Sequence, residues 1–203
     1  MNNPFRCFIA IELEKAFQDT IADVQQRLKD SSADVSWVKP QIAHITLKFL
    51  GDVPAKKIDS VKETFRDALK DSRKFEITLE HWGAFPKIEF PQIIWIGVQD
   101  ETQTCLKIAD ILENKFATLG FKKERREFHP HITIGRIRSG KSPGALTEAL
   151  RHQPVPHDHS QTVEHVTLFK STLTSQGPIY DPLETFHFSQ VKGFRKDAGR
   201  SAR

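Results

Sequence analysis

The chain has 203 residues, enough for one domain with a substantial core or for two small lobes that share one. Its composition, 38% hydrophobic and 28% charged, is typical of a globular protein, and no apolar run approaches the roughly 18 residues that a membrane-spanning helix needs. Residues 192–203 hold five Lys or Arg and one Asp, which equals the whole net charge of +4, so the rest is neutral and is no general binder of polyanions. We expect one folded unit over residues 1–190, a basic, disordered tail over 191–203, and no membrane association.

The cysteine content and the N-terminal segment favour a cytoplasmic location. Cys7 and Cys105 form no CxxC pair and are too few for a disulfide framework, as expected in a reducing compartment. The N-terminal segment has neither a basic leader nor a small-residue cleavage site, so Phe5–Leu13 is interpreted as a first strand rather than a signal peptide.

Strand and helix patterns alternate along the rest of the chain. In chain order we expect a helix at Ala16–Lys29, extended segments at Trp37–Val38 and His44–Leu50, and a helix after Pro54 with Ile58, Val61, Phe65 and Leu69 on one face. Strands follow at Phe75–His81 and Ile93–Val98, joined by a proline-containing loop, and then a helix at Gln103–Leu119. The remaining elements are a strand at Phe128–Ile137, a short helix at Ala145–Arg151, and strands at Val163–Lys170 and Leu183–Phe188. This order predicts an α+β protein.

Two segments carry the chemistry, AHITLKFLG at residues 43–51 and PHITIGR at residues 130–136. Because side chains alternate between the two faces of a strand, each segment offers an imidazole and a hydroxyl on one face and apolar residues on the other. The side chains predicted to meet are His44, Thr46, His131 and Thr133. Two such strands would hold a phosphate between a histidine that takes a proton and one that gives a proton, with no metal needed.

Arg136 is a candidate for a third kind of phosphate contact. It follows His131 by five residues, so a regular strand would turn it to the opposite face. A twist or bulge after Gly135 is needed to aim its guanidinium at a phosphate.

The tetrapeptide pattern alone does not select the pair, because His165-Val166-Thr167-Leu168 also fits it. The flanking sequence does. The chain resembles the two-histidine phosphoesterases, and among them the RNA 2′,3′-cyclic phosphodiesterases first known as 2′–5′ RNA ligases. The resemblance extends from Phe5 to about Phe188 and rests on FRCFIAIEL, WVKPQIAHITLKFLGDV, GAFP, IIWIGV, LGFKKERREFHPHITIGRIR and VTLFKSTL.

This resemblance implies a bilobal fold in which two antiparallel sheets line a central cleft and the helices lie outside. It implies that His44 is the proton donor to the leaving oxygen, that His131 is the base that activates water, and that no cofactor or metal takes part. It further implies that Thr46, Thr133 and Arg136 contact the phosphate. His129, two residues before His131, departs from many relatives, and we expect it to perturb the base or to contact substrate.

The predicted function is hydrolysis of RNA 2′,3′-cyclic phosphate ends to 2′-phosphomonoesters, with 2′–5′ ligation as the reverse reaction. The expected partner is RNA with such an end, tRNA fragments included, and the protein is expected to act as a monomer without an obligatory protein partner. One alternative is a phosphodiesterase for small cyclic nucleotides or 2′–5′ oligonucleotides. Another is a non-catalytic module that binds RNA or nucleotides.

Several other features are interpreted as structural. His165 is predicted to be a structural residue, and His157-Asp158-His159 a solvated loop rather than a metal site. Phe49, Trp37 and Phe128 are predicted to be core residues rather than base-stacking platforms.

Overall fold

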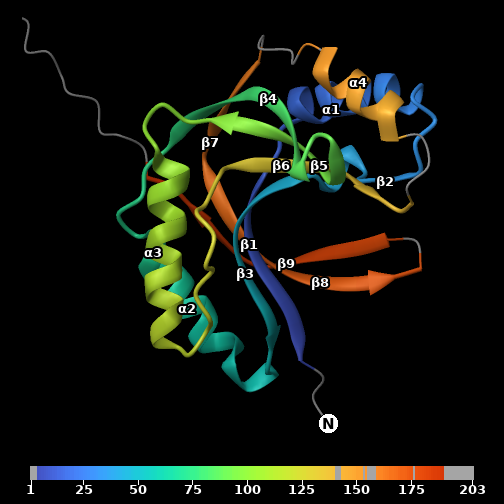
Figure 1. The fold of residues 1–203 in the computed structure, drawn as a ribbon. Coiled ribbons are helices and arrows are strands. Elements are labelled where there is room, and N and C mark those ends of the chain that lie inside the picture. The colour runs from blue at the N-terminus through green and yellow to red at the C-terminus, as the bar shows by residue number, and fades with distance from the viewer. Residues whose placement is uncertain (1–3, 140–142, 153, 155–158, 176, 190–203) are drawn as a thin grey trace, which may run out of the picture.

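The computed structural model describes residues 4–139, 143–152, 154, 159–175 and 177–189. The whole predicted tail, residues 191–203, and the residues His157 and Asp158 lie outside these ranges. Figure 1 shows four α-helices packed around a curled antiparallel sheet. The elements are β1 (Phe5–Glu12), α1 (Lys15–Lys29), β2 (Val35–Trp37), β3 (His44–Val53), α2 (Ile58–Leu69), β4 (Phe75–Lys87), β5 (Phe90–Gln99), α3 (Thr104–Thr118), β6 (His131–Ile137), α4 (Pro143–His152), β7 (Ser160–Val163), β8 (His165–Thr174) and β9 (Gly177–His187), with short 3-10 turns at Pro40–Ile42 and Ala55–Lys57.

The sheet consists of two halves that meet at one point. Its strand order is β7-β4-β5-β6-β3-β1-β8-β9, and all of these pairs are antiparallel. β2 pairs antiparallel with the end of β6, on the edge of β6 that does not face β5 and beyond its contact with β3. The half with β6 and the half with β3 are joined through the single residue pair Ile45↔Ile132. The predicted α+β class with two antiparallel sheets is therefore confirmed, and the two sheets are continuous at this pair.

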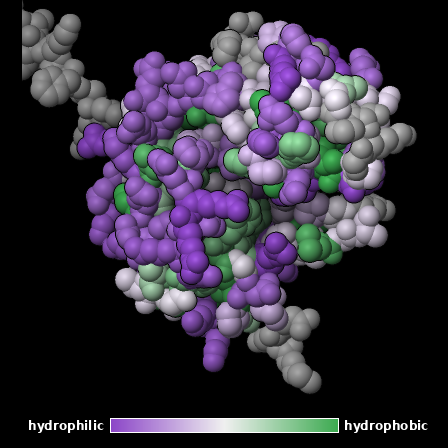
Figure 2. All heavy atoms as spheres, in the orientation of Figure 1, coloured by the Kyte–Doolittle hydropathy of each residue, from purple (hydrophilic) through white to green (hydrophobic). Residues whose placement is uncertain are grey.

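Each half of the sheet has its own pair of helices on one face. In Figure 1, α2 and α3 cover the half that contains β3, and α1 and α4 lie over the half that contains β6. The periodic apolar residues that predicted the helices are the ones buried against the sheet, for example Phe17 and Ile21 on α1 and Val61 and Phe65 on α2. The space-filling view in Figure 2 shows hydrophilic residues over α2 and α3, with an apolar hollow beside them.

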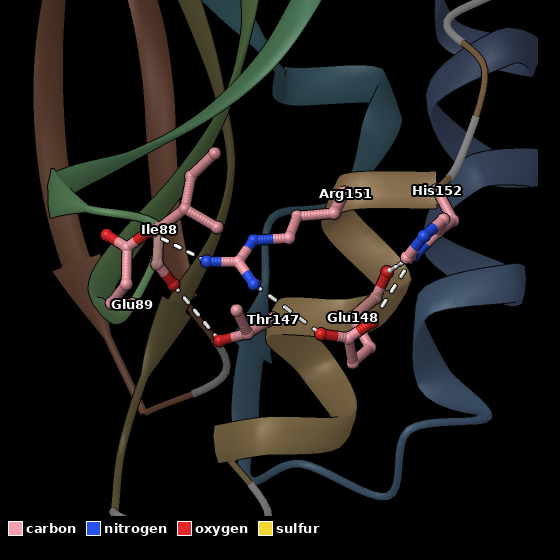
Figure 3. Close-up of polar contacts among 6 residues, drawn as sticks. All are labelled: Ile88, Glu89, Thr147, Glu148, Arg151 and His152. Atoms are coloured by element: carbon pink, nitrogen blue, oxygen red, sulfur yellow. Dashed lines mark hydrogen bonds and ion pairs between the residues drawn. The ribbon is translucent and has the colours of Figure 1, made fainter.

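Helix α4 is fastened to the tip of the β4–β5 hairpin. Figure 3 shows Thr147 donating its hydroxyl hydrogen to the Ile88 carbonyl at 3.0 Å and Arg151 donating to the Glu89 carboxylate at 2.8 Å. Arg151 also lies 3.5 Å from Glu148 of the same helix. These contacts fix the hairpin against the layer that α4 belongs to.

The predicted proline-containing loop between two strands is wrong, because that segment is the end of the β4–β5 hairpin. The strands continue to Lys87 and from Phe90, and only two residues turn. Pro86 and Pro91 face each other in this hairpin. Both lie beyond the residues that β7 and β6 pair with, so their missing N–H groups cost no sheet hydrogen bond.

The predicted strand Val163–Lys170 is two strands. β7 pairs with β4 in one half of the sheet, whereas β8 pairs with β1 in the other. Glu164 is the connection between them. No helix in the described ranges is long and apolar enough to cross a membrane.

Candidate active site

The two His-x-Thr segments lie on neighbouring strands in the middle of the sheet, on β3 and β6. Ile45 and Ile132, which pair across these strands, are fully buried on the core side. Because adjacent residues of a strand point to opposite faces, the residues before and after each isoleucine project from the other side, which we call the site face. The site face carries four half-buried side chains of the two segments: His44, Thr46, His131 and Thr133.

Both imidazoles are held in the same way. His44 Nδ1 lies 2.9 Å from the Ile42 carbonyl oxygen, and His131 Nδ1 lies 2.7 Å from the His129 carbonyl oxygen. A carbonyl oxygen only accepts hydrogen bonds, so Nδ1 carries the hydrogen in both rings. The free Nε2 atom of each neutral ring therefore has the lone pair that can take a proton, and each imidazolium can give one from the same atom.

Burial lowers the pKa of both histidines below the ordinary value. For His44 the loss of hydration is opposed by the Ile42 carbonyl and by the negative charge of Glu12, and is reinforced by the positive charge of His131. For His131 it is opposed by the His129 carbonyl and reinforced by positive charge on the His129 and Arg136 side chains. A positive charge on His131 thus makes His44 harder to protonate, and the neutral form of both rings is favoured in the free protein.

A β-bulge turns Arg136 onto the site face. One residue of β6, Ile134, has no partner on β5, and the regular pairing resumes after it. The extra residue reverses the alternation, so Arg136 shares its face with His131. The Ile134 carbonyl accepts hydrogen bonds from Gln25 Nε2 at 2.9 Å and from the Val38 N–H at 3.0 Å. These two hydrogen bonds stabilise the bulge, and neither donor belongs to β5. The structure has the required irregularity one residue before the predicted position.

Aromatic rings surround His44 on the site face. The Phe8 and Tyr180 ring centroids lie 4.8 and 5.3 Å from that of His44. Phe49, whose centroid is 6.3 Å from that of Phe8, is 65% exposed, so its prediction as a core residue is wrong. A bulge at Leu47 in β3 causes this, because it moves Phe49 from the core face to the site face. Trp37 and Phe128 do pack against the core, as predicted.

Two aromatic rings from the β4–β5 hairpin flank His131. The Phe85 centroid lies 5.3 Å and the Trp95 centroid 6.0 Å from that of His131. The Trp95 ring lies directly against the backbone of Gly83, where a Cβ atom would stand 2.0 Å from the nearest ring carbon. Gly83 is therefore needed for the ring to occupy this place.

Comparisons with known proteins show the family of this chain. Residues 13–175 match the family model of the 2′-5′ RNA ligase superfamily. This chain belongs to that superfamily. The resemblance inferred from the sequence is therefore confirmed.

Relatives of this superfamily member align over most of its length. A protein of Methanothermobacter thermautotrophicus named RNA 2′,3′-cyclic phosphodiesterase is 33% identical over 181 residues, which cover 89% of this chain and 97% of the relative. A protein of Aeropyrum pernix with the same name is 35% identical over 161 residues, covering 77% and 90%. The crystal structure of E. coli LigT complexed with 3′-AMP superposes with a TM-score of 0.75 at 25% identity, covering 92% of this chain and 99% of LigT.

His165 is not part of the paired arrangement in this superfamily member. It lies on β8, separated from β3 by β1, and its Nε2 atom is 3.3 Å from Glu12 Oε2. His129 contributes its carbonyl to the His131 ring and lies 4.0 Å from Glu127 through its own ring. Its expected influence on the base is thus electrostatic, because its positive charge lowers the pKa of His131.

Other features of the chain lie apart from the site face. Within the described residues, no group of three His, Cys, Asp or Glu side chains is arranged to hold a metal ion. A pocket of about 610 Å³ between α2, α3 and the start of β4 contains none of the site residues. The sequence analysis missed Glu12, Tyr180 and Phe85 beside the histidines, because their proximity depends on strand order rather than on a local motif.

Proposed function

We propose that this chain is an RNA 2′,3′-cyclic phosphodiesterase that acts with His44 as general acid and His131 as general base. The observation that carries the proposal is the pair of imidazoles on one face of adjoining strands, each with Nδ1 bound to a carbonyl and Nε2 left to exchange protons. The names of the relatives supply the substrate class.

In the proposed hydrolysis, His131 Nε2 takes a proton from a water molecule whose oxygen attacks phosphorus. The bond from phosphorus to the ribose 3′ oxygen breaks on the opposite side, and His44 Nε2 gives that oxygen a proton. The product is a 2′-phosphomonoester with a 3′ hydroxyl. The choice of the 3′ oxygen as leaving group comes from the family resemblance.

The transition state carries extra negative charge on the non-bridging phosphate oxygens. Thr46 and Thr133 bring hydroxyl donors to the site face beside the histidines, and Arg136 brings a fixed positive charge. Such donors are most effective when they are already in place, because no reorganisation is then needed as the charge develops. By microscopic reversibility, the same groups would join a cyclic phosphate to a 5′ hydroxyl as a 2′–5′ linkage.

The aromatic rings that flank the histidines support a nucleotide substrate. Phe49 offers an exposed ring on the site face, and a base can stack on such a ring. The similar LigT forms a complex with 3′-AMP, which is consistent with a nucleotide as ligand of this fold.

The test is a comparison of three substrates with the wild-type protein: an RNA that ends in a 2′,3′-cyclic phosphate, a cyclic mononucleotide and a 2′–5′ linked dinucleotide. We expect the RNA end to have the highest kcat/KM and to yield only the 2′-phosphomonoester. Preference for either small substrate would select the alternative phosphodiesterase. Binding without turnover of any of the three would select the non-catalytic module.

Variants then test the residue roles. His44→Ala and His131→Ala should each reduce kcat at least about a hundredfold with little change in binding, which is the usual effect of losing a general acid or base. His152→Ala on α4 is the matched control and should leave kcat unchanged. Turnover should not respond to a metal chelator. A hundredfold loss in His165→Ala would show that the wrong histidine pair has been assigned.

A further inference from the structure

A row of polar side chains crosses the site face from β3 to β8. Glu12 on β1 stands directly opposite His44 on β3, and the register of β1 with β8 brings His165 to its other side. Glu12 Oε2 lies 3.3 Å from His165 Nε2 and accepts the Thr167 hydroxyl hydrogen at 2.8 Å. His165 and Thr167 of the third His-x-Thr segment therefore both contact the carboxylate that faces His44.

The carboxylate lies close enough to His44 to affect its charge. Directly opposed side chains in an antiparallel pair have their Cβ atoms about 5 Å apart. The Glu12 side chain is 50% exposed and that of His165 is 37% exposed, so the attraction to His44 is screened but not removed. Elsewhere around His44 lie His131 from β6 and Tyr180 from β9, whose ring packs edge-on against it. The positive charges of Arg136 and Arg6 are close enough to Tyr180 to lower its pKa against the effect of burial.

We propose that Glu12, held by hydrogen bonds from His165 and Thr167, is a positioning residue that increases the fraction of His44 that is protonated and can act as the general acid. The inference rests on the proposed function, since it assigns Glu12 a role in that same reaction. Burial, and less strongly the positive charge of His131, lower the pKa of His44, and the Ile42 carbonyl and the negative charge of Glu12 oppose this shift. Without Glu12, His44 would lose its proton at lower pH and the acid would be absent from more of the enzyme.

His165 has a second effect, because an uncompensated carboxylate near the site would repel an anionic substrate. The bond to Glu12 raises the pKa of His165, with further help from the nearby charges of Glu164 and Glu14, and lowers the pKa of Glu12. The Glu12–His165 pair therefore keeps a negative charge on Glu12 and a positive charge on His165 up to a higher pH than an ordinary histidine would allow. The His187 ring, 5.4 Å from that of His165, is the remaining titratable neighbour in this cluster.

The first experiment follows the side-chain resonances of the histidines by NMR as pH is varied, in the full chain without substrate. In Glu12→Gln, which keeps the shape of the side chain and one acceptor oxygen but removes the charge, the His44 midpoint should move to lower pH. In His165→Ala it should move to higher pH, because Glu12 then acts without a compensating charge. Glu76→Gln, an exposed carboxylate on β4, is the control and should change neither. Midpoints that stay in place in both site variants would overturn the proposal, as would shifts in the same direction.

The second experiment separates kcat from KM. Glu12→Gln should reduce kcat/KM roughly threefold to tenfold at pH 8 and leave it unchanged at a pH where His44 is protonated in both proteins. His165→Ala should raise KM roughly threefold, and this increase should disappear in the double variant, which lacks the repelling carboxylate. A KM increase that persists in the double variant would overturn the shielding role.

The two proposals fail in different ways. If His44→Ala keeps its turnover, the acid role of His44 is wrong, whatever the NMR titrations show. If His44→Ala is inactive but Glu12→Gln leaves the His44 midpoint unchanged, the catalytic assignment holds and the role of Glu12 is wrong.

Discussion

The ion pair between Lys48 and Glu113 is the sharpest test of how this fold holds its first histidine strand. Lys48 follows the β3 bulge and its side chain is 1% exposed, whereas that of Glu113 on α3 is 21% exposed. Lys48 Nζ lies 2.8 Å from Glu113 Oε1, and Glu113 Oε2 accepts the Glu124 N–H at 3.1 Å. Glu113 therefore connects β3 with the segment that leads to His131.

The unequal burial of the two partners predicts unequal costs of removing them. Glu113→Leu leaves a buried ammonium without a counter-charge, and we expect a loss of about 3–5 kcal/mol in the free energy of unfolding. Lys48→Met keeps most of the buried hydrocarbon and leaves a carboxylate that water still reaches, so we expect about 1–2 kcal/mol. The double variant should lie close to Lys48→Met.

Thermal and urea unfolding of the four proteins measure these differences. For a chain of this size, about 2–4 °C in Tm corresponds to each kcal/mol. Equal losses in the two single variants, or a larger loss in Lys48→Met, would refute the reasoning from burial.

Three further predictions concern activity. The pKa values of His44 and His131 are both lowered, so kcat/KM, which reports the free enzyme, should peak below pH 6.5, the ordinary histidine value, and a peak near pH 8 would contradict this. Arg136→Met should reduce kcat by about 10²-fold or more with the RNA end, measured by single-turnover cleavage, and an unchanged kcat would mean that the guanidinium does not contact the phosphate. Phe49→Ala should raise KM for the RNA end about tenfold with kcat unchanged. The control is Phe90→Ala, because the Phe90 side chain is 68% exposed, about as much as that of Phe49, and this variant should leave KM unchanged.

Strand alternation allowed much of the site to be predicted from the sequence. In the motif of β6, Ile132 and Ile134 are fully buried, and the His131 and Thr133 side chains are half-buried on the other side. A period of two residues is sufficient to predict that division wherever the strand is regular. The helices were predictable for a similar reason, because apolar residues spaced like Val61 and Phe65 lie on one face only if the segment is helical, and that face is then buried against the sheet.

The features that were not predicted depend on departures from that period or on strand order. Lys48 reads as an exposed residue of an alternating strand, yet it is buried and paired with a carboxylate far along the chain. The approach of Glu12 to both His44 and His165 depends on β1 lying between β3 and β8. No short window of sequence contains that information, because Glu12 is 32 residues from His44 and 153 residues from His165.

The two bulges show that the resemblance between the halves is closer than their sequences suggest. In β3 the first unpaired residue after the histidine is Leu47, three positions on (a second irregularity leaves Leu50 unpaired), and in β6 it is Ile134, again three positions after the histidine. Each bulge reverses the alternation, so the residue five positions after each histidine joins the site face. These residues are Phe49 in one half and Arg136 in the other. The same backbone irregularity thus presents an exposed ring on the side of the proposed acid and a guanidinium on the side of the proposed base. A substrate that needs both is one with a stacking base attached to a phosphate, which is what an RNA end provides.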